Sequence, residues 1–253
     1  MTWIRGVGMA TLLFAGTLSF VQPIAAGEEE SAVAELVATH DAAALTRALD
    51  QDRDRIRMVD EEGCTLLHRA AEDGWLEGIR ILVGRGASLD AANLLRFKPL
   101  HMAAAAGKPA AIDLLISLGT PATADDGRGT TALHVAAVQN RPEVCRMLLE
   151  HGAEVNASNA GGETPLHWAV DDGHERMART LLDAGANPLL RTADGKTPLD
   201  VARAKGYSVL VALLEDAERS AKRRPAGATA PRPPEEPFYK DPATLPALID
   251  FFQ

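Results

Sequence analysis

The sequence predicts an all-α repeat solenoid, in which about six copies of a helix-turn-helix unit stack side by side. Two observations carry this prediction. A short residue pattern recurs along the chain at a fixed step, and a period of roughly 20 to 50 residues is typical of repeat architectures. Apolar residues make up 46% of the 253 residues, yet aromatic residues make up only 4%. A core built mainly from small and aliphatic side chains suits closely packed helices.

The period is 33 residues, as the step from His68 to His101 shows, and three sets of positions keep it in one register. The first set lies in a short motif that starts each predicted first helix. The motif begins at Thr65, Lys98, Thr131, Thr164 and Thr197. Three residues after these stand His68, His101, His134, His167 and Asp200. The second set consists of Gly74, Gly107, Asn140, Gly173 and Gly206. The third set consists of Gly86, Gly119, Gly152 and Gly185, with Glu218 in the last place.

Each set of positions has a physical role in a helix pair. A Thr at a helix start accepts hydrogen bonds from unpaired backbone N–H groups, and a His three residues later can bond back toward the turn, as in a capping box. Gly or Asn just past the helix tolerates the left-handed conformation that ends it. The apolar residues Val144, Met147, Leu148 and Leu149 then follow helical spacing. They predict a second helix that packs on its neighbours.

These motifs resemble the ankyrin repeat, whose signature is Thr-Pro-Leu-His-x-Ala followed by Gly and a second helix. The best copy begins at Thr131 and ends at Asn156, and the match covers residues 62 to 215. We interpret residues 32 to 60 as a degenerate capping repeat. We interpret the last repeat, where Asp200 replaces His, as a second capping repeat, because a terminal repeat exposes a face that inner repeats bury. We therefore expect an ankyrin-repeat domain over residues 29–219.

Residues 1–26 have the order of a signal peptide. Arg5 precedes an uncharged apolar stretch over residues 6–21, and the small residues Ala25 and Ala26 follow. That stretch is shorter than the roughly 20 residues of a membrane span. We expect export to the periplasm, or secretion if the source lacks an outer membrane, with no membrane span in the mature chain. The alternative is an anchor helix that is not cleaved.

Residues 220–253 change in composition and are interpreted as a Pro-rich linker followed by an aromatic tail. Phe238, Tyr239, Phe251 and Phe252 are four of the eight Phe and Tyr residues in the chain. Since so many aromatic side chains are unusual in a solvated end, we expect residues 238 to 253 to dock on a hydrophobic surface. That surface belongs either to the array, around Met102 and Trp168, or to a partner.

No pattern indicates a catalytic, cofactor or metal site. Equivalent histidines of stacked repeats lie about 10 Å apart, whereas metal ligation brings nitrogens to about 2 Å from one shared ion. Cys145 falls on a second helix and is predicted to be a buried structural residue. Cys64 falls on a turn and is predicted to be more exposed, too far from Cys145 for a disulfide. A formal net charge of -9 argues against a nucleic-acid partner.

The resemblance to ankyrin proteins implies a binding surface formed by the loop tips and the outer ends of the first helices. The second tip, residues 93 to 97, carries large apolar residues where polar and Gly residues are usual. The acids Glu72 and Asp73 are expected to flank this surface. The predicted contact residues are Leu94, Leu95, Arg96, Phe97, Met102, Val138, Trp168, Asp171 and Asp172. The alternative is that Leu94 and Phe97 fold back onto their own repeat, or that the tail covers them.

The resemblance implies a protein that binds another protein and is not an enzyme. We expect a periplasmic protein, monomeric alone, that scaffolds or protects a partner, and its resemblance to bacterial periplasmic ankyrin proteins implies a link to catalase and peroxide resistance. The alternative is an immunity protein or inhibitor, whose concave face blocks the active site of a toxin or enzyme.

Overall fold

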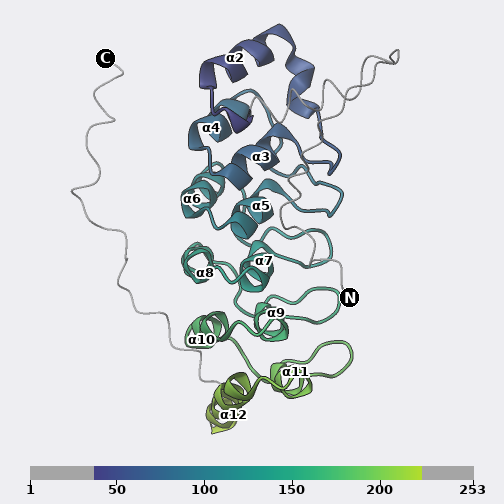
Figure 1. Cartoon of the computed structure of the whole chain (residues 1–253), viewed down its shortest axis with the longest axis vertical. Coiled ribbons are helices and arrows are strands. Elements are labelled where there is room, and N and C mark those ends of the chain that lie inside the picture. The colour runs from purple at the N-terminus through teal and green to yellow at the C-terminus, as the bar shows by residue number, and fades with distance from the viewer. Residues whose placement is uncertain (1–36, 224–253) are drawn as a thin grey trace, which may run out of the picture.

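A computed structural model of the chain describes residues 37–223, which form one elongated stack of helices (Figure 1). The predicted signal peptide, residues 1–26, lies outside the described residues, as do residues 224–253 of the linker and tail. Within the described part, all named elements are helical, and the β-structure is limited to two isolated antiparallel bridges, Val59 with Thr65 and Asp125 with Thr131. The predicted all-α repeat solenoid is confirmed.

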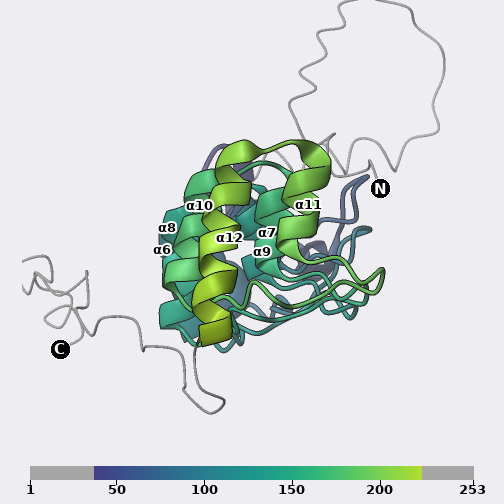
Figure 2. The same ribbon diagram turned by 90° about the horizontal axis from the view of Figure 1, so that it is seen from below.

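Ten of the helices form five successive antiparallel pairs. The pairs are α3 (Leu66–Asp73) with α4 (Leu76–Gly84), α5 (Pro99–Ala106) with α6 (Pro109–Ser117), α7 (Ala132–Val138) with α8 (Pro142–Glu150), α9 (Pro165–Asp171) with α10 (Glu175–Asp183), and α11 (Pro198–Lys205) with α12 (Ser208–Arg223). Helix α2 (Ala42–Gln51) and the 3-10 helix η1 (Arg53–Arg57) precede them, and α2 packs against α4. Seen along the stack, the loops project beyond the first helices of the pairs, away from the layer of second helices (Figure 2).

The repeated sequence motifs set where the first helices begin and end. Thr65, Thr131, Thr164 and Thr197 are N-cap residues with extended backbone, and Pro occupies the first turn of α5, α9 and α11. The fixed φ of Pro suits that position. The set from Gly74 to Gly206 adopts positive φ throughout, including Asn140 at 52°. The predicted left-handed ends of the first helices are therefore confirmed.

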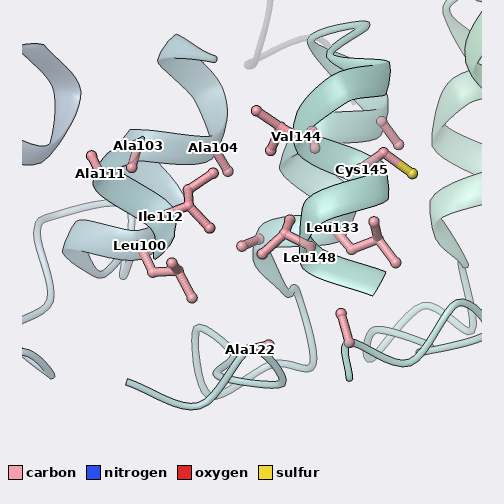
Figure 3. Close-up of a cluster of buried hydrophobic side chains, with 14 of the residues drawn as sticks. Leu100, Ala103, Ala104, Ala111, Ile112, Ala122, Leu133, Val144, Cys145 and Leu148 are labelled. Carbon is pink, nitrogen blue, oxygen red and sulfur yellow. The ribbon is translucent and has the colours of Figure 1, made fainter. Parts of the chain in front are cut away.

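One continuous hydrophobic core runs through the stack, because each helix pair buries its apolar residues against the next pair. Figure 3 shows a section of it, in which Leu100 and Ile112 of one repeat lie near Leu133, Val144 and Leu148 of the next. Ala103 and Ala104 lie in the same core and allow close approach of the helices. No helix among residues 37–223 has the length and apolarity that crossing a membrane requires.

The two cysteines are free thiols in this core. Cys145 is fully buried, as predicted, and burial raises the pKa of its thiol to about 12. The prediction for Cys64 was wrong, because its side chain is also fully buried. The loop tip of the following repeat covers it, and its Sγ accepts a hydrogen bond from Asn93 Nδ2 at 3.3 Å. Burial likewise raises the pKa of the Cys64 thiol.

Candidate functional site

The histidines of the first helices join each repeat to the next. In His68 and His134, Nδ1 accepts a hydrogen bond from the backbone N–H of the N-cap residue, at 3.1 and 3.2 Å. The ring proton therefore lies on Nε2. That nitrogen donates to a carbonyl 29 residues ahead, in the loop of the following repeat. The four such pairs are His68 with Phe97, His101 with Thr130, His134 with Glu163 and His167 with Lys196, at 2.9 to 3.1 Å.

This pairing makes the histidines structural. Both ring nitrogens are engaged, and burial lowers the pKa of all four rings, that of His134 to about 4. Sequence reasoning found the bond back to the N-cap but missed the bond forward to the next loop. The fixed spacing between each His and the residue before the next N-cap is the signal that was available.

Asp200 takes the place of the histidine in the last repeat. Its carboxylate accepts hydrogen bonds from the backbone N–H and the hydroxyl of Thr197, both at 3.0 Å. The backbone bond from Thr197 is the main reason why the pKa of Asp200 lies below its ordinary value. An acid that caps its own helix needs no acceptor in a following repeat.

The loop tips share one hydrogen-bonded turn. In the second tip, Asn93 Oδ1 accepts hydrogen bonds from the N–H groups of Leu95 and Phe97, at 3.0 and 2.9 Å. Asp60, Asp126 and Asn159 bond in the same way in their own tips. The fourth residue of the turn is left-handed in every repeat. Gly63, Gly129, Gly162 and Gly195 hold this place with φ between 70° and 81°.

Arg96 holds this place in the second tip, with φ of 66°. A left-handed residue other than Gly costs roughly 1–2 kcal/mol, so the turn is strained where its counterparts are relaxed. Elsewhere a backbone bond joins adjacent tips, as from Leu94 N–H to the Glu62 carbonyl and from Ala160 N–H to the Arg128 carbonyl, at 3.0 and 2.7 Å. Between the second and third tips the Arg96 side chain makes the connection, because its Nε donates to the Asp126 carbonyl at 2.8 Å.

The second tip exposes two large apolar side chains. Leu94 is 75% and Leu95 60% exposed, the highest values among the large hydrophobic residues of the part that the structure describes. Asn93 beneath them is buried, so a fixed turn presents the two leucines to solvent. Leu94 does not fold back onto its own repeat. Phe97 does, because its ring stacks on His101 with centroids 5.4 Å apart and planes 8° from parallel.

Met102 is a correction to the predicted contact residues. Its side chain is only 8% exposed and lies under the second tip, where Asn93 Nδ2 approaches its Sδ at 3.9 Å. The tip shields this position, so Met102 belongs to the core and offers little surface to a partner.

The other predicted contacts lie farther along the first-helix face. Val138 and Trp168 are half-buried, and Trp168 Nε1 donates to Glu163 Oε2 at 3.0 Å while its ring meets His134 edge-on. Asp171 and Asp172 are exposed at the end of α9, and Asp171 pairs with Lys205 at 2.8 Å. The structure thus places Leu94, Leu95 and Arg96 in one tip, two repeats away from Trp168 and its neighbouring acids.

Three acids of the first repeat share one arginine. Arg69 forms ion pairs with Asp60, Glu62 and Glu72 at 2.6 to 2.9 Å. The predicted acidic flank at Glu72 is therefore part of a salt-bridge cluster, and Asp73 lies 3.7 Å from the His40 ring. This cluster fixes the first tip against its helix and leaves the second tip as the apolar feature of the loops.

The paired helices and their projecting loops define a helical repeat solenoid. A family model described as ankyrin repeats (3 copies) matches residues 20–121 and 90–159, and one described as ankyrin repeats (many copies) matches residues 148–202. The first model's matches run from residue 20 to residue 159, more than half of the 253 residues, so the chain belongs to the ankyrin-repeat family. No curated protein matches the chain. The family indicates a protein–protein interaction module with a protein partner, and its members are generally non-catalytic.

Proposed function

We propose that this chain is a non-catalytic binding protein that engages its partner through the second loop tip and the adjoining first-helix face. The exposed pair Leu94 and Leu95 carries the proposal. A few apolar anchors supply most of the binding free energy in protein interfaces, and here the buried Asn93 holds them in a fixed turn before binding. A preformed turn loses little conformational entropy when a partner docks.

The proposed setting is the periplasm, where the protein scaffolds or protects its partner. The order of residues 1–26 supports export. The resemblance to periplasmic ankyrin proteins supports a partner such as a catalase, and a role in peroxide resistance. The competing proposal is an inhibitor or immunity protein that covers the active site of an enzyme or toxin.

Capture from periplasmic extract, followed by quantitative mass spectrometry, tests the surface. We expect a protein captured by the wild-type chain to be lost from a Leu94→Ser/Leu95→Ser variant. It should be kept by Val209→Ser, which changes a side chain of α12 that is 51% exposed and lies far from the tips. Equal capture by all three chains would contradict the proposed surface.

The activity of the captured protein separates the two roles. If the chain is a scaffold or protector, the partner's activity should survive peroxide or heat longer when the chain is bound. If the chain is an inhibitor, activity should fall on binding and return when the Leu94→Ser/Leu95→Ser variant replaces it.

A further inference from the structure

Two exposed arginines lie in the second and third loop tips, Arg96 directly after the exposed leucines and Arg128 one tip farther along the stack. Arg96 and Arg128 are exposed, and within residues 37–223 neither forms a salt bridge. Arg96 Nε bonds a carbonyl, and its Nη2 lies over Gly127, where an added Cβ would be 2.6 Å away. The guanidinium thus packs against the backbone of the third tip at Gly127.

The second and third tips together therefore offer apolar side chains and cationic groups. Leu94 and Leu95 offer apolar contact, and the guanidinium groups of Arg96 and Arg128 offer donors to a carboxylate. Arginine binds carboxylates with strong charge-assisted bonds. The occupant that fits is a segment with an acidic residue between large apolar residues.

The chain contains such a segment in its own tail. Residues 245–252 read Leu-Pro-Ala-Leu-Ile-Asp-Phe-Phe, so that Asp250 stands between Ile249 and Phe251. These residues lie outside the described part of the structure, and the inference uses only their sequence.

The linker is long enough to bring the segment to the tip. Residues 224–244 number 21 and include six prolines. In an extended proline-rich form, at about 3.1 Å per residue, they span up to roughly 65 Å. The second tip lies three repeats before α11 and α12, and at about 10 Å per repeat the separation along the stack is roughly 30 Å. A tether of this kind gives an effective concentration in the millimolar range, so weak contacts suffice.

We propose that residues 245–252 dock on the second loop tip of the same chain, with the Asp250 carboxylate against Arg96 and Arg128 and the flanking apolar side chains against Leu94 and Leu95. This deepens the proposed function and rests on it in one respect, that a partner uses the same tip. The tail then occupies the partner's site until the partner displaces it.

Disulfide trapping in the full-length chain tests the contact. The native thiols of Cys64 and Cys145 are fully buried and do not compete. In a Leu95→Cys/Phe252→Cys variant under mild oxidant, we expect an intramolecular disulfide that forms at a rate independent of protein concentration. Adding Asp250→Lys or Arg96→Gly should slow it by about tenfold or more, as expected when an anchor of a small interface is removed.

Two controls keep the result interpretable. Arg96→Gly installs the residue that the other four tips carry, so misfolding does not explain a slower reaction. A Val209→Cys/Phe252→Cys variant reports random collision at an exposed apolar position nearer to the start of the tether. The proposal is overturned if trapping at Leu95 is no faster than at Val209, if neither Asp250→Lys nor Arg96→Gly slows it, or if the disulfide forms only between chains.

The two proposals fail in different ways. If trapping fails while capture of a partner still depends on Leu94 and Leu95, the tail inference falls and the binding function stands. If trapping succeeds and no protein is captured even by the full-length Asp250→Lys variant, the tail docks and the proposed function falls.

Discussion

The second and fourth loop tips have the same backbone turn but expose different side chains. Asn93 and Asn159 each hold their turn through one side-chain oxygen. At the left-handed place the fourth tip has Gly162, and the second tip has Arg96. The fourth tip exposes Ala160 and Gly161, whereas the second exposes Leu94 and Leu95.

This difference shows that the residues that hold the turns recur, whereas the exposed residues of the tips vary. The side-chain oxygen that holds each of these turns recurs with the period, and so does the histidine of the preceding repeat that donates to the last carbonyl of the tip. The outward residues do not recur and are free to vary. Exposed residues that differ from the repeat pattern are therefore the candidates for binding a partner. Substitutions of the buried residues that follow the pattern are expected to lower the stability of the array.

The largest loss of stability is expected when a histidine of an inner repeat is removed. His134→Ala should lower the free energy of unfolding by about 3 kcal/mol or more, because it leaves the Glu163 carbonyl and the Thr131 N–H unsatisfied beside a cavity. Asp200→Ala, at the exposed end of the stack, should cost no more than about 1 kcal/mol, as for loss of an N-terminal cap. Urea unfolding of both variants measures the contrast, and equal losses would contradict it.

Met102 and Leu94 compare a core position with a surface position at the same tip. Met102→Ala should cost about 2–4 kcal/mol, since the side chain is buried under the tip. Leu94→Ala should change the free energy of unfolding by less than about 0.5 kcal/mol. Thermal melts of the two variants test this, and a large loss for Leu94→Ala would mean that the leucine stabilises the array.

The histidines also make stability depend on pH. Burial lowers the pKa of these rings below the ordinary 6.5, so between the two values the unfolded chain binds more protons than the folded chain. Their contribution is complete above about pH 6.5 and is lost as the pH falls toward the folded pKa. For His134, with a pKa of about 4, the stability gap between wild type and His134→Ala should narrow by about 2 kcal/mol from pH 7 to pH 5. Denaturant titrations at the two pH values measure this gap, and a constant gap would show that the pKa of His134 is the same in the folded and unfolded chains.

The smallest effects compare the left-handed positions directly. Gly162→Ala should lower stability by about 1–2 kcal/mol, because its φ is 70° and an added Cβ would lie 3.0 Å from Ala193 N. Arg96→Gly relieves strain but loses the bond to the Asp126 carbonyl, so stability should stay unchanged or rise by up to about 1 kcal/mol. Differential scanning calorimetry measures whether each variant unfolds at a lower or a higher temperature than the wild-type chain. A clear loss for Arg96→Gly would show that Arg96 supports the fold.

The repeat fold was predictable because its signals are local and recur. The N-cap Thr residues and the Gly positions fixed the helix boundaries, and the structure bears them out. What failed depended on how the loop tips fold over the helices. Cys64 lies under the tip of the next repeat and Met102 under the tip of its own repeat, which no single motif reveals. The strained Arg96 could have been found, because Gly63, Gly129, Gly162 and Gly195 share its place in the period.

The forward bonds of the histidines have a direction that matters during synthesis. The repeats emerge in order from the N-terminus, so the ring nitrogen of each newly made repeat stays open to solvent until its acceptor is made. The acceptor arrives with the next loop, as Glu163 does for His134. The hydrogen bonds of each histidine are thus completed by the following repeat. The last repeat needs no such partner, because Asp200 bonds to Thr197 of its own helix start.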